Sequence, residues 1–231
     1  MMYLSRLKLS KDPSVAALSA LIDPKERARA MDAHHRLVWS AFAGNPDRDR
    51  DFLWRHDGKD VFYVLSSSLP SKTPFFDKVE TKPFSPALQA GDRLAFTLRV
   101  NATRSAPFDP KDLAPNGRHR RRKTDIVMHA LKDTRDRATQ RMPLARQEAE
   151  RWMHSQGRAK GFALENLDVE DYSVMSLPGH TGRRKGQPQF GILDLTGILS
   201  VEDPDAFRAA LNTGFGRAKA FGCGLMLVRR A

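Results

Sequence analysis

The chain has 231 residues, 40 % of them hydrophobic and 29 % charged, which is ordinary for a soluble globular protein of one large or two small domains. Its formal net charge of +12 attracts polyanions, so nucleic acid is the expected partner; no basic amphipathic helix favours a membrane surface instead. A single cysteine, Cys223, excludes an internal disulfide and a cysteine-based zinc cluster, and the histidines have no metal-binding spacing, so neither metal nor cofactor is expected.

The first ninety residues predict strands that surround one helix. Asp23-Pro24 has the composition of a helix start, with Asp as the N-cap and Pro in the first turn, and the helix is expected to reach Phe42. The strands expected here are short runs of apolar or alternating side chains, at residues 2–9, 51–55, 60–66 and, more weakly, 78–84. The N-terminus lacks the apolar stretch of a signal peptide, so a cytoplasmic location is expected.

The rest of the chain repeats this alternation. A long polar helix is expected at residues 136–156, closed by Gly157, and a second helix at 203–212. Two very basic stretches, 104–125 and 179–186, are expected to be loops. The strands expected in this half are residues 93–100, 168–177, 190–201 and 224–229.

The order of these elements predicts an α+β fold of two tandem ferredoxin-like domains. The second cycle reads strand, helix, strand, strand, helix, strand, which is the βαββαβ, RRM-like unit. The first cycle lacks part of this pattern and is therefore expected to be a degenerate copy. The boundary is expected near Ala90-Gly91, which gives an N-terminal domain of residues 1–90 and a C-terminal domain of residues 91–231.

A glycine-rich segment, GFGRAKAFGCGLMLV, spans residues 214–228 near the end of the chain. A Rossmann GxGxxG loop needs a third glycine where Lys219 stands and should follow a strand, and a P-loop needs GKS or GKT. The segment fits neither nucleotide-binding loop. Closely spaced glycines allow the backbone to approach a partner and expose N–H groups, so Gly214, Gly216 and Lys219 are candidates for contacts with the phosphates of a nucleic acid. Tight packing of the turn explains the glycines equally well.

Four stretches together resemble the CasE type of CRISPR repeat-RNA endoribonuclease, the processing subunit of the type I-E surveillance complex. The most specific is the glycine pattern GxGxxKxxGxGL, which follows a helix in that family as it is expected to do here. The stretches are MYLSRLKL at the start, HHRLVWSAF (34–42), GDRLAFTLRVNAT (91–103), and TGILSVEDPDAF (196–207) with the glycine-rich segment. The resemblance implies two ferredoxin-like domains and, as partners, a repeat stem-loop RNA and the other subunits of the complex.

The resemblance also implies a catalytic histidine. His34 and His35 are adjacent on a helix, about 100° apart, and either could lie at the rim of a cleft. From the residues alone, a lone helical histidine is more often structural. The family has its catalytic histidine within an HRxxW-like sequence, which His35 fits and His34 does not. A tyrosine found three residues earlier in some relatives is replaced here by Asp32, so a mechanism that depends on this tyrosine is in doubt.

Two basic clusters are candidates for phosphate binding, because affinity for a nucleic acid grows with each phosphate neutralised. A solvated charge run is the usual alternative for each cluster. Arginine forks suit phosphates and bases alike, and an A-form stem is recognised mainly by its shape and phosphates. The expected RNA-binding cations are Arg36, Arg104, Arg118, Arg120, Arg121, Arg122, Lys123, Arg183 and Arg184.

The activity implied by the resemblance is metal-independent cleavage of precursor CRISPR RNA at the repeat stem-loop. The 2′-OH attacks the adjacent phosphate and gives a 2′,3′-cyclic phosphate and a 5′-OH. His35 would transfer protons near neutral pH, and Lys185 is the candidate for stabilising the phosphate charge. The alternatives are a non-catalytic module that binds an RNA hairpin and a general basic nucleic-acid binder, of which the second leaves the glycine pattern unexplained.

Overall fold

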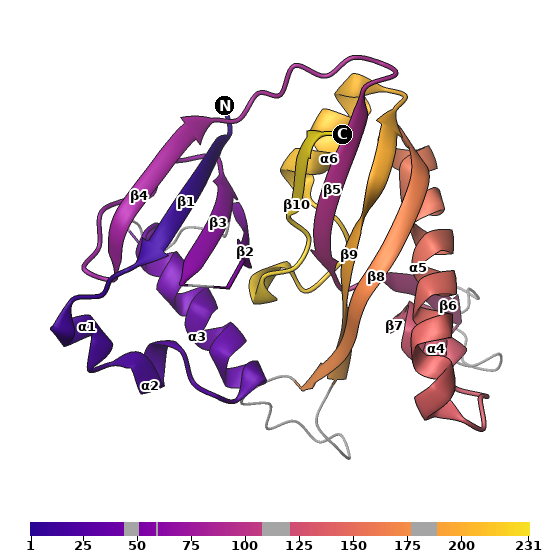
Figure 1. Ribbon diagram of the computed structural model, residues 1–231, viewed down its shortest axis with the longest axis horizontal. Helices are drawn as coiled ribbons and strands as arrows, with labels where there is room; N and C mark the ends of the chain where they lie inside the picture. The colour runs from indigo at the N-terminus through magenta and orange to yellow at the C-terminus, as the bar shows by residue number, and fades with distance from the viewer. Residues whose placement is uncertain (44–50, 59, 108–120, 177–188) are drawn as a thin grey trace, which may run out of the picture.

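A computed structural model describes the chain except for residues 44–50, 59, 108–120 and 177–188. Two antiparallel four-stranded sheets form two domains that lie next to each other (Figure 1). A separate two-stranded hairpin stands on the far side of the second sheet from the first domain. Within the described residues, none of the helices is both long and apolar enough to span a lipid bilayer.

The first sheet has the strand order β2-β3-β1-β4, the order of a βαββαβ unit. Helix α3 (Arg27–Ser40) packs on it through Leu37 and Val38, which are buried against Leu7, Trp54 and Phe62 of the sheet. Residues 67–75 join β3 to β4 without a helix, so the second helix of the unit is missing and the domain is degenerate, as expected. The strands are β1 (Tyr3–Leu9), β2 (Phe52–His56), β3 (Val61–Ser66) and β4 (Phe76–Pro83).

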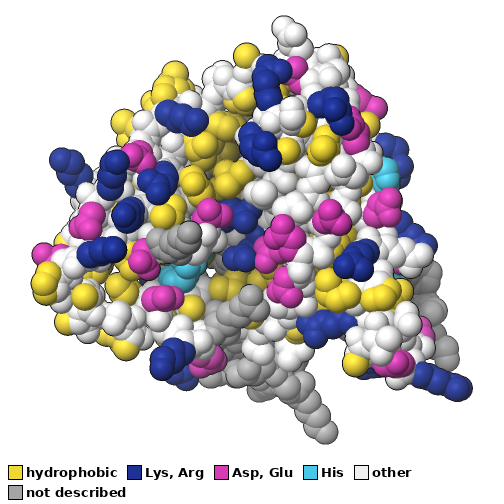
Figure 2. Space-filling view, in the orientation of Figure 1, with side chains coloured by type: hydrophobic (Ala, Val, Ile, Leu, Met, Phe, Trp, Pro, Cys, Tyr) yellow, Lys and Arg dark blue, Asp and Glu magenta, His cyan; other side chains and the backbone are white. Residues whose placement is uncertain are grey.

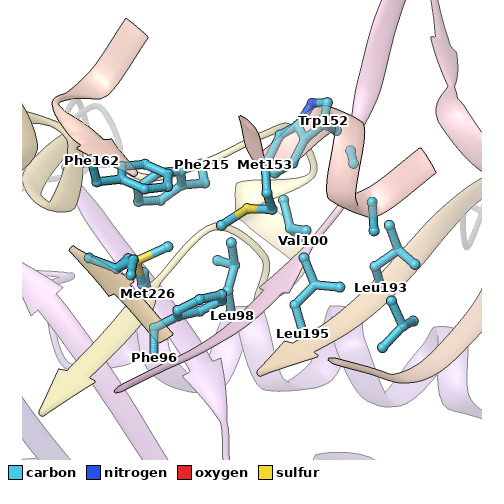
Figure 3. Close-up of a cluster of buried hydrophobic side chains, with 14 of the residues drawn as sticks. Phe96, Leu98, Val100, Trp152, Met153, Phe162, Leu193, Leu195, Phe215 and Met226 are labelled. Carbon is cyan, nitrogen blue, oxygen red and sulfur yellow. The ribbon is translucent and has the colours of Figure 1, made fainter. Parts of the chain in front are cut away.

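The second sheet has the order β10-β5-β9-β8 and forms a complete unit. Helices α5 (Arg137–Lys160) and α6 (Pro204–Thr213) cover one face of it, and Figure 3 shows Met153 and Phe215 among the side chains buried there. The strands are β5 (Arg93–Val100), β8 (Phe162–Ser176), β9 (Gln189–Val201) and β10 (Met226–Arg230). The expected α+β fold of two tandem ferredoxin-like domains is confirmed. The boundary expected near Ala90-Gly91 falls in the connection between β4 and β5 and stays a prediction.

Two expected helix ends are wrong. Asp23 does not start the long helix, because α3 begins only after its N-cap, Glu26. Two short helices, α1 (Pro13–Ala16) and α2 (Ser19–Ile22), precede Asp23. Gly157 does not end α5, which continues to Lys160 and stops at Gly161 with φ of 75°. A Cβ at Gly157 would lie 2.2 Å from the carbonyl oxygen of Phe162, so this glycine allows close packing inside the helix.

The basic stretch expected to be a loop is in part a β-hairpin. Strand β6 (Thr103–Pro107) pairs with β7 (Arg121–Asp125), and the short helix α4 (Ile126–Ala130) follows at once. Asp125 caps α4 by accepting hydrogen bonds from the backbone N–H groups of Val127 and Met128. The hairpin was missed because its charged sequence shows no apolar alternation.

Candidate active site and nucleic-acid interface

Helix α3 carries its two histidines into different surroundings. His34 is 7 % exposed and points toward the first sheet, where its ring lies 5.1 Å from that of Phe62. His35 is half-buried, and its ring stacks on Trp54 with the centroids 6.5 Å apart and the planes at 15°. The ring of Trp39, one turn further along the helix, lies 6.1 Å from that of His35. Trp54 thus contacts both imidazoles, since its ring centroid lies 6.5 Å from that of His34 as well, with the planes at 83°.

His35 follows Met31 by four residues, so both lie on the same side of α3. Met31 packs against Met175, Ile192 and Cys223 of the second domain. The helix also contacts η1 (Lys219–Phe221), a short 3₁₀ turn within the glycine-rich segment. This side of α3 thus meets the second domain.

His34 belongs to a cluster that the sequence did not reveal. Its Nε2 lies 3.1 Å from Oδ1 of Asp23, and its ring centroid is 4.6 Å from that of His56 at the end of β2. Burial lowers the pKa of His34, and the Asp23 carboxylate partly counteracts this. Burial also lowers the pKa of His56, and so does the neighbouring His34. Both shifts favour the neutral form of the ring.

These two histidines line a cleft of about 590 Å³ between the domains. Figure 2 shows basic, acidic and histidine side chains gathered around this hollow. His35 is not among the lining residues. Those that bear charge or an imidazole are Asp23, Lys25, His34, Arg55, His56, Asp57, Arg99 and Asp194. Arg55 and His56 lie next to each other in a strand that was expected from the sequence, but only the tertiary fold brings them to His34.

The glycine-rich segment is packed tightly between the two domains. A Cβ at Gly216, where φ is 65°, would lie 2.5 Å from the carbonyl oxygen of Asn101. A Cβ at Gly214 would lie 2.7 Å from Leu53 in the first domain, and one at Gly222 would lie 3.2 Å from the ring of Trp54. The packing explanation of these glycines is supported, and their contact with RNA stays a prediction.

Lys219 of this segment caps the carboxyl end of α6. Its Nζ donates to the carbonyl oxygen of Thr213 at 2.6 Å, while Nζ of Lys160 donates to Gly214 at 3.3 Å and lies 4.1 Å from the centroid of the Phe215 ring. Burial, and then the charge of Lys219, lowers the pKa of Lys160 to about 8. Two cations thus lie at the negative end of the helix dipole.

The expected RNA-binding cations fall into separate regions. Arg104 and Arg122 share one face of the β6–β7 hairpin and are exposed, as is Lys123 on its other face. The hairpin lies far from α3 in Figure 1, so it is not part of the histidine site. Arg36 is exposed on α3 and pairs with Asp32 at 2.9 Å. The backbone of Arg121 lies in β7, whereas Arg118, Arg120, Arg183, Arg184 and Lys185 lie outside the described residues.

The structure is that of a protein of tandem ferredoxin-like domains with imidazoles and guanidinium groups in the cleft between them. The profile of the family described as CRISPR associated protein matches residues 2–230. The chain belongs to this family.

Among curated proteins, the chain is 26 % identical over 214 residues to the CRISPR system Cascade subunit CasE of Escherichia coli strain K12, with 90 % of this chain and 96 % of that protein covered. Its fold matches that of Cas6e from E. coli K-12 with a TM-score of 0.63 and 19 % identity, over 99 % of this chain and 100 % of the other. It also matches Thermus thermophilus Cse3 bound to an RNA that represents a pre-cleavage complex, with a TM-score of 0.62 and 23 % identity over 99 % and 98 % of the two chains. The expected resemblance to the CasE type is confirmed.

Proposed function

We propose that the protein is a metal-independent endoribonuclease that cleaves precursor CRISPR RNA at the repeat stem-loop and stays bound within the type I-E surveillance complex. The observation that carries the proposal is the family match over residues 2–230. The curated relative is named a Cascade subunit, and a structural relative is named a CRISPR endoribonuclease and was solved with a 19 nt RNA. The net charge of +12 suits an RNA partner. The proposed location of the protein, together with this RNA, is the cytoplasm.

The chemistry requires little of the protein beyond position and proton transfer. The 2′-OH of the ribose upstream of the cut loses its proton to a base and attacks the adjacent phosphorus. The bond between phosphorus and the 5′-oxygen then breaks, and that oxygen takes up the proton held by the base, which leaves a 2′,3′-cyclic phosphate and a 5′-OH. Because the nucleophile comes from the substrate, the protein needs only to hold the RNA in the reactive geometry and to supply an imidazole for proton transfer.

His35 is the proposed proton-transfer residue, because imidazole exchanges protons near neutral pH. Stacking on Trp54 restricts the orientation of its ring, and the Met31–His35 side of α3 meets the glycine-rich segment. Lys185 is proposed to stabilise the charge of the pentacoordinate phosphate. Asp32 stands at the place of the tyrosine found in some relatives and pairs with Arg36 at 2.9 Å, so this scheme assigns no catalytic role to that place.

The first experiment is incubation of the protein with a repeat-containing stem-loop RNA, with and without EDTA. We expect equal cleavage rates, and a product that carries a 2′,3′-cyclic phosphate. A parallel RNA with a single deoxyribose at the cut position should stay intact. Loss of cleavage in EDTA would exclude the metal-free scheme, and cleavage of the deoxy substrate would exclude 2′-OH attack.

The adjacent histidines provide a matched pair of variants. His35→Ala is expected to lose cleavage while it keeps its affinity for the stem-loop, whereas His34→Ala should keep cleavage once corrected for its folded fraction. His34 has an observation in its favour, since it lines the cleft and its ring is held by Asp23. The opposite result, with His34→Ala inactive and His35→Ala active, would assign the proton transfer to His34.

A second candidate is a non-catalytic module that binds the RNA hairpin. It is favoured by the aromatic packing of His35 among Trp39, Phe52 and Trp54, which is also how a structural histidine packs. This candidate predicts tight, hairpin-selective binding without any cleavage between about pH 7 and 8, where an imidazole is active. The endoribonuclease predicts both binding and cleavage under the same conditions.

A further inference from the structure

Arg55 in strand β2 carries a largely buried positive charge that is only loosely paired. Its side chain is 13 % exposed and lines the cleft between the domains. Nη1 donates to Oγ1 of Thr97 at 3.0 Å, but Nη2 lies 3.7 Å from the Asp57 carboxylate, beyond an ordinary hydrogen bond. The buried Nε has no hydrogen-bond partner among the described residues. The guanidinium therefore has donors left over.

Arg99 of β5, in the same cleft, is by contrast fully paired with a carboxylate. Its Nε and Nη2 donate to the two oxygens of Asp194 at 2.8 and 2.9 Å. Burial lowers the pKa of Arg55, and so does the charge of Arg99, while the carboxylates of Asp57, Asp194 and Glu170 act in the opposite direction. Because a guanidinium stays charged in proteins, an incompletely paired one disfavours the folded state. The incomplete pairing of Arg55 is typical of a guanidinium that binds an anionic ligand.

The rest of the cleft is suited to a phosphodiester. Two of its carboxylates are already engaged, Asp23 with His34 and Asp194 with Arg99. The rings of His34 and His56 form one wall, and both domains contribute lining residues to the volume of about 590 Å³. Arg55 lines this space with a side chain that is 13 % exposed, and a guanidinium fork matches two oxygens of one phosphate.

We propose that the cleft between the domains binds a backbone phosphate of the RNA strand and that Arg55 is the residue that holds it. This inference rests on the proposed function, from which RNA is taken as the ligand, and it adds a phosphate contact in the cleft. An acidic protein segment would also match a cation, but the net charge of +12 and the forked donor favour a nucleic acid.

The test compares Arg55→Gln and Arg55→Lys with Arg93→Gln. Arg93 is a matched control, because its guanidinium is 61 % exposed and is paired with Glu165 at 2.7 Å at the start of β5. The probe is a labelled CRISPR-repeat stem-loop RNA with a single-stranded flank and one deoxyribose at the cut, titrated between about 50 and 200 mM salt. Arg55→Gln should weaken binding about 10- to 100-fold and reduce the slope of log K against log salt by about 1.

The two other variants make this result specific. Arg55→Lys should bind more tightly than Arg55→Gln, because it keeps the charge but loses the fork, and Arg93→Gln should bind like the wild type. Arg55→Gln removes a poorly solvated cation, so its Tm should not fall. Inorganic pyrophosphate should raise the Tm of the wild type, and should do so less in Arg55→Gln.

Several results would overturn the inference. Arg55→Gln with wild-type affinity and salt slope would show that the residue holds no phosphate, and loss of binding that only accompanies a lower Tm would show a structural role. If Arg55→Gln binds RNA as tightly as the wild type does but loses affinity for polyglutamate, the cleft binds an acidic protein segment. If the wild-type protein binds no RNA, the proposed function fails, and the pyrophosphate measurement still decides whether Arg55 forms an anion site.

Discussion

Gly216 offers the sharpest test of the packing in the glycine-rich segment. Its φ is 65°, a conformation that L side chains rarely adopt. A Cβ there would lie 2.5 Å from both the carbonyl oxygen of Asn101 and Cγ2 of Val100, and the first of these is backbone that cannot rotate away. Gly216→Ala therefore adds conformational strain and a steric clash together.

The two contributions can be separated with Gly91→Ala. Gly91 also has a positive φ, 88°, but a Cβ there would meet nothing within 4 Å. A left-handed conformation costs an L residue about 1–2 kcal/mol, and forcing extra volume into a packed site costs about 1–3 kcal/mol. We therefore expect Gly216→Ala to lower the free energy of unfolding by about 2–5 kcal/mol, and Gly91→Ala by about 1–2 kcal/mol.

Urea unfolding followed by circular dichroism measures both values. Equal losses in the two variants would refute the steric argument at Gly216. RNA affinity, corrected for the folded fraction, then separates packing from binding. Unchanged affinity in Gly216→Ala would leave the glycine a packing role only, and lost affinity in a folded protein would support an RNA contact.

Three further predictions follow from the described contacts. Burial lowers the pKa of His34 and His56, so below about pH 6.5 the unfolded rings take up protons while the folded rings stay neutral. The free energy of unfolding should therefore fall as pH drops through that range, by at most about 1.4 kcal/mol per pH unit for each ring. A flat pH profile of the wild type, or the same profile in a variant with both histidines changed to Asn, would contradict this. Tyr172→Phe removes a 3.0 Å hydrogen bond to the buried Asp125 carboxylate and should cost about 1.5–3 kcal/mol in urea unfolding, so wild-type stability would be the contrary result. Arg122→Gln on the exposed face of the hairpin should weaken RNA binding and reduce the salt slope by about 1, and an unchanged slope would exclude a phosphate contact there.

Regular alternation made much of the fold predictable. Residues 93–100 alternate polar and apolar side chains, and β5 has these bounds with Leu94, Phe96 and Leu98 buried. The order of elements then identified the complete second unit. Expectations failed where tertiary packing overrides a local signal, as at Gly157, where the glycine serves close contact with Phe162 instead of ending the helix.

The candidate site was less accessible to sequence reasoning. His35 was selected by a resemblance, since its spacing alone leaves His34 equally open. The cluster of Asp23, His34 and His56 joins three elements that no local pattern connects. Asp23 was interpreted as a helix cap because Asp-Pro is a common helix start, yet its carboxylate is used by a histidine ring instead.

The contact of Trp54 with Gly222 has a consequence for building chimeras. The indole belongs to the first domain and the glycine to the second, and a Cβ at the glycine would lie 3.2 Å from the ring. Leu53 and Gly214 form a second pair of this kind. A hybrid that takes each domain from a different relative would therefore have to exchange these partners as matched pairs, because a large side chain from one parent would meet a Cβ from the other.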